Sequence, residues 1–267
     1  MKLPCPTRTG LCCLRSSRLG QAAALVTMAM MLVSCSSVLE GPQMPAAAQT
    51  ESTSSIMRLA SVAEAKGDRE DALALYRRAV AANPNQAEAQ AALGRALIAR
   101  DEPEAALRHF EEATRLQPDE VSYRTRIGQA QLAAHQPELA RATFEGVLAV
   151  DPQAGLAHNG LGIALDALGR HGEAQEQYRQ ALVVDPECVA ARNNLGLSLG
   201  LSGNYEEAIR QLRPIALGTN AVPRARQNLA VVLALKGEND DAAKLARIDL
   251  REDDVQSNLK VLALLHR

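Results

Sequence analysis

Ser198 is the residue whose neighbours most resemble a catalytic motif. It lies in Gly196-Leu-Ser-Leu-Gly200, which matches the G-x-S-x-G pattern of a hydrolase nucleophile elbow. That motif needs a sharp strand-to-helix turn to expose the serine, whereas this segment reads as a helix. Two of the motif's residues are also accounted for by the sequence repeat described below. We therefore expect no catalytic site, and hydrolytic activity that Ser198→Ala abolishes would contradict this.

The five histidines are the other candidates for proton transfer or metal binding. They lie at scattered positions without the paired spacing of a metal site: His109, His135, His158, His171 and His266. No glycine-rich loop of the phosphate-binding type is present in the sequence. We expect no metal, no cofactor and no small-molecule substrate.

Cys35 is the cysteine with a predicted chemical role. The segment before it contains four basic residues, Lys2, Arg8, Arg15 and Arg18, and no acidic one. A twelve-residue apolar run follows, 22–33, which is too short to span a bilayer comfortably. This segment reads as a signal peptide. Its end, Leu32-Val33-Ser34-Cys35, resembles the lipobox of bacterial lipoproteins, which implies that residues 1–34 are removed and that Cys35 receives a diacylglyceryl thioether. The alternative is an ordinary signal peptide with an incidental cysteine.

The other cysteines predict no disulfide. Cys5, Cys12 and Cys13 would leave with the signal peptide, so Cys188 has no intramolecular partner and is expected to be a plain loop thiol.

Removal of the signal peptide also leaves 25 basic against 31 acidic residues, a net charge of −6. Because phosphate binding needs a basic surface, this net charge argues against nucleic acid as a partner.

After Cys35, residues 36–52 contain Gly and two Pro without helical or strand periodicity. They predict a flexible tether reaching roughly 55–60 Å.

The elements that position any site follow from a repeat of 34 residues. A large residue is followed by a small one in each repeat, and an alanine, a bulky residue and a proline recur downstream. The pairs are Leu59-Ala60, Leu93-Gly94, Ile127-Gly128, Leu161-Gly162, Leu195-Gly196 and Leu229-Ala230; the alanines are Ala72, Ala106, Ala140, Ala174, Ala208 and Ala242; the bulky position holds Tyr76, Phe110, Phe144, Tyr178, Leu212 and finally Ala246; the prolines are Pro84, Pro118, Pro152 and Pro186, with Asn220 in the fifth place.

This spacing is that of the tetratricopeptide (TPR) repeat. Small residues let two helices approach closely, large residues fill the remaining space, and proline ends the second helix. The sequence predicts an all-α, right-handed solenoid of six helix-turn-helix TPR repeats over residues 53–252. A capping helix is expected in 253–267, where Asp253 and Asp254 precede an apolar segment. Asp68 and Asn204 stand where second helices should have an N-cap.

The TPR resemblance implies that the first helices line a concave groove for a ligand. The groove positions divide into two sets. Repeats one to three offer a polar wall of mixed charge: Arg58, Ser61, Glu64, Arg95, Arg126 and Gln129. Repeats four to six offer carboxamides beside an apolar stripe: Asn159, Asn193, Asn194, Gln227 and Asn228 with Ile163, Leu197, Leu201, Val231 and Leu235. Carboxamides both donate and accept hydrogen bonds, so the second set suits a peptide. Alternatively, several of its members pack against the adjacent helix or the cap.

The segment 224–237 and its continuation through 242–250 resemble the C-terminal repeat of TadD-like lipoproteins of the tight-adherence (Flp) pilus system. The lipobox and the solenoid agree with that family. Membership implies a protein anchored to the outer membrane, facing the periplasm, that helps a secretin or other pilus component assemble. Ser36 after Cys35 is typical of lipoproteins sent to the outer membrane. A general periplasmic scaffold for cell-wall enzymes or other complexes would use the same fold and anchor.

Overall fold

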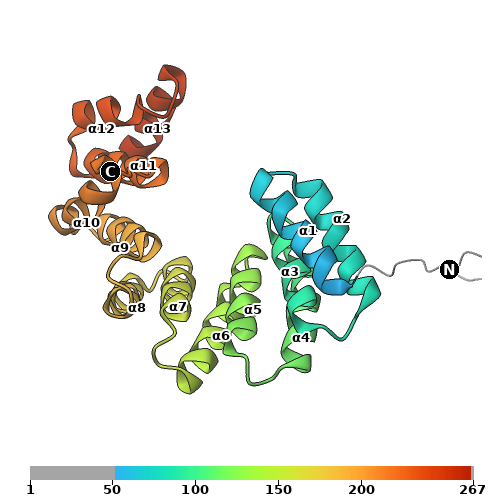
Figure 1. The fold of residues 1–267 in the computed structure, drawn as a ribbon. Helices are drawn as coiled ribbons and strands as arrows, with labels where there is room; N and C mark the ends of the chain where they lie inside the picture. The colour runs from blue at the N-terminus through green and yellow to red at the C-terminus, as the bar shows by residue number, and fades with distance from the viewer. Residues whose placement is uncertain (1–51, 266–267) are drawn as a thin grey trace, which may run out of the picture. The chain divides into compact units, whose positions relative to one another are not determined.

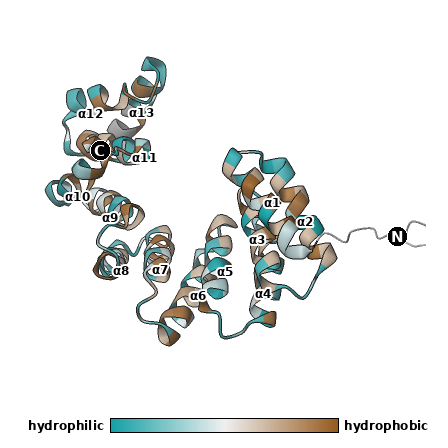
Figure 2. Ribbon diagram, viewed as in Figure 1, coloured by the Kyte–Doolittle hydropathy of each residue, from teal (hydrophilic) through white to brown (hydrophobic). Residues whose placement is uncertain are grey.

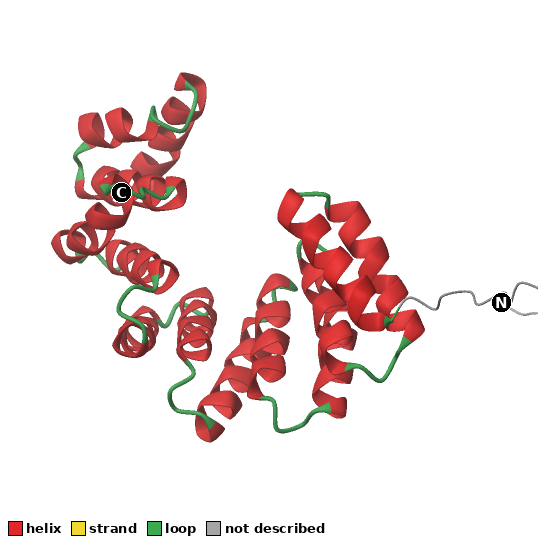
Figure 3. Ribbon diagram, viewed as in Figure 1, coloured by secondary structure: helices red, strands yellow, loops and turns green. Residues whose placement is uncertain are grey.

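The computed structural model describes residues 52–265, which form helices joined by short turns, with no strand among them (Figures 1 and 3). The predicted signal peptide, Cys35 and residues 36–51 of the tether lie outside the described residues. In the part that is described, no helix has the length and apolar character needed to cross a membrane. The described helices are α1 (Thr53–Lys66), α2 (Arg69–Ala82), α3 (Ala87–Ile98), α4 (Pro103–Leu116), α5 (Val121–Ala133), α6 (Pro137–Val150), α7 (Gly155–Ala167), α8 (His171–Val184), α9 (Val189–Leu201), α10 (Tyr205–Leu217), α11 (Pro223–Lys236), α12 (Asn239–Ala246) and α13 (Glu252–Leu265).

The helices α1 to α12 form six consecutive pairs, one for each predicted repeat. Each helix packs against the next in the chain, and the first helices of neighbouring repeats, such as α5 and α7, also touch. The last helix, α13, packs against α11 and α12. Most helices carry both apolar and polar residues (Figure 2), as expected when one face packs and the other meets water. The prediction of an all-α repeat solenoid is confirmed.

Close contacts between a glycine and a bulky side chain hold each middle repeat together. A Cβ atom at Gly94 would lie 2.7 Å from Cε1 of Phe110, and one at Gly162 would lie 2.4 Å from Cε1 of Tyr178. Gly128 faces Phe144 and Gly196 faces Leu212 in the same way. The bulky side chains are at most 1% exposed. The first helix therefore needs a small residue at this position, because the large side chain of the second helix of the same repeat fills the space beside it.

The turn inside every repeat has the same hydrogen bond. The backbone N–H at the start of each second helix donates to the carbonyl five residues earlier, as from Asp68 to Ala63 and from Asn204 to Leu199, both at 2.9 Å. The preceding residue has a positive φ, and it is glycine in four repeats but Asp101 and His135 in the other two. This is the left-handed ending typical of helix C-termini. Asp68 and Asn204 do occupy the N-cap position, but their side chains make no capping hydrogen bond.

The corner between repeats is built around the predicted prolines. Helices α2, α4, α6 and α8 each end two residues before Pro84, Pro118, Pro152 or Pro186. In each case a side chain of the following helix donates to the proline carbonyl: Gln90 Nε2 at 2.8 Å, Arg124 Nη2 at 2.6 Å, His158 Nε2 at 3.1 Å and Arg192 Nη2 at 2.5 Å. These donors are also 34 residues apart. The partly buried His158 thus has a structural role at this corner.

The two ends of the solenoid differ from its middle. Leu59 is 48% exposed, whereas Leu93, Leu161, Leu195 and Leu229 are at most 5% exposed. No described helix precedes α1 to cover Leu59. At the other end α13 supplies the cover, and its Val255 is 1% exposed.

Candidate functional site

The groove residues predicted in repeats four to six lie around two cavities. We name these the central cavity and the repeat-six cavity. The central cavity is lined by six of the predicted residues: Asn159, Ile163, Asn193, Asn194, Leu197 and Leu201. The repeat-six cavity is lined by three more: Gln227, Asn228 and Val231. Leu235 is buried and lines neither cavity.

The central cavity lies between α7, α8, α9 and the start of α11 and has a volume of about 630 Å³. Ligand pockets commonly enclose about 300–1,000 Å³. Its lining is mainly apolar, and Leu201 at its edge is 53% exposed. Six further lining residues were not singled out from the sequence: Asp166, Tyr178, Val189, Ala190, Val222 and Arg224. The TPR register assigns only first-helix positions to the groove, so it does not point to Tyr178 on α8 or to the residues at the helix starts. Asp166 does lie on a first helix, in the register position of Glu64, but its residue type alone did not single it out.

The predicted asparagines form a chain of hydrogen bonds across three first helices. Asn228 Nδ2 on α11 donates to Asn193 Oδ1 at 2.9 Å, and Asn194 Nδ2 on α9 donates to Asn159 Oδ1 on α7 at 3.0 Å. A longer contact of 3.4 Å from Asn193 Nδ2 to Asn194 Oδ1 joins the two pairs. Asn193 is only 7% exposed. These side chains therefore bind neighbouring helices together, and each carboxamide keeps only part of its hydrogen-bonding capacity for a ligand.

Asp166 connects three helices beside the central cavity. Its Oδ2 accepts from Tyr178 OH at 2.9 Å, and its Oδ1 contacts His171 Nδ1 at 2.8 Å and accepts from Ser198 Oγ at 2.7 Å. Burial and the Asp166 carboxylate together raise the pKa of Tyr178 far above its ordinary value, so the phenol remains a donor. The same pair of groups recurs 102 residues earlier, where Tyr76 OH donates to Glu64 Oε2 at 2.7 Å.

Ser198 does not have the surroundings of a catalytic nucleophile. Its Oγ donates directly to a carboxylate, and His171 contacts that carboxylate rather than the serine. An activated serine needs a hydrogen bond to a general base such as histidine, which the carboxylate in turn orients. Ser198 is also 1% exposed, in the helical register that holds the buried Ala130 and Ala164 in earlier repeats. A hydroxyl at this buried position needs an acceptor, and Asp166 provides it.

The polar wall predicted in repeats one to three contributes to neither cavity. Arg58 and Arg95 are exposed, while Arg126 is partly buried and donates from Nη1 to Gln129 Oε1 at 3.2 Å. Burial, and secondarily the charge of Arg95, lower the pKa of Arg126. Ser61 bonds the Arg58 carbonyl, and Glu64 is engaged by Tyr76. These residues place charged and polar groups along the first helices of repeats one to three. None of them lines the central cavity or the repeat-six cavity.

No group of three or more His, Cys, Asp or Glu side chains within residues 52–265 is arranged to hold a metal ion. Cys188 is a free, partly buried thiol at the residue before α9. His266 and the predicted lipidation site Cys35 lie outside the described part of the chain.

Three solved structures show how far the fold is shared. A TPR protein of Parabacteroides merdae ATCC 43184 is 14% identical, with a TM-score of 0.65 over 79% of this chain and 84% of its own. Pseudomonas aeruginosa pilF is 18% identical, with a TM-score of 0.59 over 73% of this chain and 89% of its own. A thermophilic TPR protein of Thermus thermophilus is 22% identical, with a TM-score of 0.58 over 67% of this chain and 100% of its own. These identities establish similarity of fold alone.

Sequence comparison gives the same family. No curated protein sequence gives a significant match to this chain. Two family models, both described as tetratricopeptide repeat, match residues 63–128, and residues 125–174 and 163–213. Together these matches run from the first repeat into the fifth, and they coincide with the helix pairs and the glycine-to-ring contacts described above. The chain belongs to the tetratricopeptide repeat family.

Proposed function

We propose that this TPR protein is a non-catalytic scaffold that holds a protein partner in the central cavity. The observation that carries the proposal is the cavity itself, which joins an apolar stripe to the polar groups of the asparagine chain. Ile163, Leu197 and Leu201 offer apolar surface, and the carboxamides beside them offer donors and acceptors to a peptide backbone. An apolar surface of this kind, rimmed by polar groups, is typical of a protein-binding site.

The proposal extends to an anchor and a location. The lipobox resemblance of residues 32–35 supports lipidation of Cys35, and Ser36 supports delivery to the outer membrane with the repeats facing the periplasm. The TadD-like C-terminal segment supports a role in assembling a tight-adherence pilus or its secretin. The similarity to pilF is one of fold and adds no weight to the pilus assignment. The second candidate is a general periplasmic scaffold, which the same anchor and groove would serve.

A capture experiment tests the groove and separates the two systems. Partners are captured from detergent-solubilised envelopes with the wild-type chain and with an Ile163→Glu/Leu197→Glu variant, and are identified by mass spectrometry. Leu139→Glu is the matched control, because Leu139 is 54% exposed on α6 and lines neither cavity. Selective loss of a secretin or pilus component in the double variant supports the pilus role. Loss of cell-wall enzymes favours the general scaffold, and identical captures contradict a partner in the central cavity.

The anchor has its own test. Cys35→Ser removes the thiol that would carry the lipid and leaves residues 52–265 unchanged. The variant should keep the circular dichroism spectrum of the wild type but move from the membrane pellet to the soluble fraction. A variant that still sediments with membranes would show that the lipobox assignment is wrong.

A further inference from the structure

The repeat-six cavity lies where the other repeats place a large side chain. In repeats one to five that position holds Tyr76, Phe110, Phe144, Tyr178 and Leu212, each at most 1% exposed. In repeat six it holds Ala246, which is partly buried, opposite Ala230 on α11. The repeat geometry that elsewhere encloses a ring or an isobutyl group therefore has only two methyl groups at this point.

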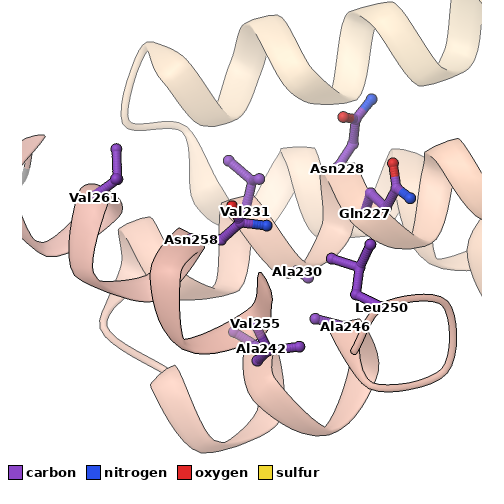
Figure 4. Close-up of a pocket in the computed structure, with 10 residues that line it drawn as sticks. All are labelled: Gln227, Asn228, Ala230, Val231, Ala242, Ala246, Leu250, Val255, Asn258 and Val261. Atoms are coloured by element: carbon purple, nitrogen blue, oxygen red, sulfur yellow. The ribbon is translucent and has the colours of Figure 1, made fainter. Parts of the chain in front are cut away.

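The space is not taken up by closer packing of α11 and α12. A cavity of about 410 Å³ remains, lined by Ala230, Ala242 and Ala246 together with Val231 and Leu250. Figure 4 shows these side chains with Val255 of α13 near Ala242 and with Gln227 and Asn228 at one side. The lining is thus apolar, with carboxamides at its margin.

We propose that the repeat-six cavity receives one large apolar side chain, phenylalanine or leucine, from a partner protein. The inference rests on the proposed function, since it takes the ligand to be a protein. Repeats two, three and five supply the template, because Phe110, Phe144 and Leu212 fill the corresponding space in this same fold. Gln227, Asn228 and Asn258 at the margin offer hydrogen bonds to the backbone on either side of the inserted residue.

The fold also predicts which side chain is excluded. Where the repeats use tyrosine, its hydroxyl donates to a carboxylate: Tyr76 to Glu64 and Tyr178 to Asp166. The residue at that carboxylate register in repeat six is Ala234. A buried tyrosine hydroxyl would lack this partner, and burying an unpaired hydroxyl is unfavourable. Phenylalanine and leucine should therefore be preferred over tyrosine.

The proposal is tested by nuclear magnetic resonance titration of the ¹⁵N-labelled full chain with capped amino acids. The probes are N-acetyl-phenylalaninamide, N-acetyl-leucinamide, N-acetyl-tyrosinamide and N-acetyl-alaninamide. The first two should give saturable shifts at the amides of Val231 and Ala246, and the last two should give weaker shifts or none. Absence of saturable shifts from the phenylalanine and leucine probes overturns the proposal, as does an equal response to all four.

Ala246→Phe supplies the matched variant, because it restores the repeat pattern and fills the cavity from within. A ring opposite alanine is already tolerated in repeat one, where Tyr76 packs beside Ala60. The variant should melt no lower than the wild type and lose the probe response. Should it fail to fold, Ala246→Leu, which follows the example of Leu212 in repeat five, serves the same purpose. A folded filled variant that keeps the response places the probes elsewhere and refutes the proposal.

The remaining outcomes are distinguishable from failure of the scaffold role. Vesicles of phosphatidylglycerol that bind the wild type but not Ala246→Phe, with no response to the amino acid probes, would assign the cavity to an acyl chain and overturn the proposal. Loss of partners from the Ile163→Glu/Leu197→Glu variant, together with a failed probe titration, would leave the scaffold role standing without this cavity.

Discussion

Phe144 is held so closely by Gly160 that a Cβ atom on the glycine would lie 2.3 Å from Cζ of the ring. The same ring also meets Gly128, whose Cβ would lie 2.6 Å from Cε1 and Cζ. Phe144 belongs to α6, Gly128 to α5 and Gly160 to α7. One ring thus joins its own repeat to the next, and a larger side chain at either glycine would displace the ring.

Gly160→Ala should therefore destabilise the solenoid even though alanine is the better helix former. Overpacking costs about 1–3 kcal/mol, and the improved helix propensity offsets up to about 1 kcal/mol. Urea unfolding should show a lower free energy of unfolding. Gly146→Ala on α6 is the control, because a Cβ there meets no atom within 4 Å, and it should gain about 0.5–1 kcal/mol. Equal effects of the two substitutions would contradict the close contact.

Asp101→Gly and His135→Gly should each stabilise the protein. The two residues have φ values of 63° and 55° in turns where the other four repeats use glycine. A left-handed conformation costs a non-glycine residue about 1–2 kcal/mol, although Asp and His tolerate it better than most. After the entropy that glycine loses on folding, a gain of roughly 0.5–1 kcal/mol in the free energy of unfolding is expected.

Gly203→Ala is the reciprocal experiment. Gly203 has a φ of 82°, and a Cβ there would meet no atom within 4 Å, so a loss of stability would come from the backbone conformation alone. Thermal melting of the three variants should give two increases and one decrease. A decrease in all three would show that the side chains of Asp101 and His135 contribute more than their conformation costs.

The sequence was enough to predict the fold because its information is periodic. Each middle repeat has a small residue and a bulky one at the positions that Gly162 and Tyr178 occupy in repeat four. The contact between the two lies within one repeat. The turn residues and the corner hydrogen bonds were missed, although they repeat as well. The side chains that donate to the proline carbonyls belong to three residue types and share only a hydrogen-bond donor. No single residue type therefore marks this position in the sequence; the four residues are Gln90, Arg124, His158 and Arg192.

The site was predicted less completely, for a reason that Asn193 and Asp166 illustrate. The register places Asn193 on a first helix, and the structure shows that it lines the central cavity. The register cannot tell that its side chain accepts a hydrogen bond from Asn228 on the next first helix. Asp166 occupies the same register position as Glu64, but its importance arises from residues that reach it from α8 and α9. Contacts between helices depend on how far each side chain reaches, and the pattern of residues along a single helix does not give this information.

Tyr76 should make stability fall in strongly alkaline solution. Burial, followed by its hydrogen bond to Glu64, raises the pKa of Tyr76 from its ordinary value of 10.0 to about 12. Because the folded pKa lies above the unfolded one, this contribution is fully present below pH 10 and is lost as the pH rises towards 12. The urea midpoint should decline more steeply above pH 10 in the wild type than in Tyr76→Phe. Parallel curves would mean that the phenol is not protected by folding.

The ion pair between Arg226 and Asp249 should have the opposite pH dependence. Nε and Nη2 of Arg226 donate to the two carboxylate oxygens at 2.7 and 2.6 Å, with both side chains at most 15% exposed. The pair joins the start of α11 to the turn after α12. The Arg226 hydrogen bonds lower the pKa of Asp249, so the stabilisation is present above the unfolded pKa of about 3.9 and is lost as the pH falls through the folded value.

Arg226→Gln should therefore lower the melting temperature at about pH 7, and the difference from the wild type should shrink below about pH 4. Arg210→Gln is the control, because Arg210 is exposed and pairs with Glu207 on its own helix. Exposed pairs of that kind contribute little to stability, so its melting temperature should stay near that of the wild type at both pH values. A deficit in Arg226→Gln that persists unchanged in acid would show that the arginine acts through packing of its side chain, since protonation of Asp249 would then remove nothing further.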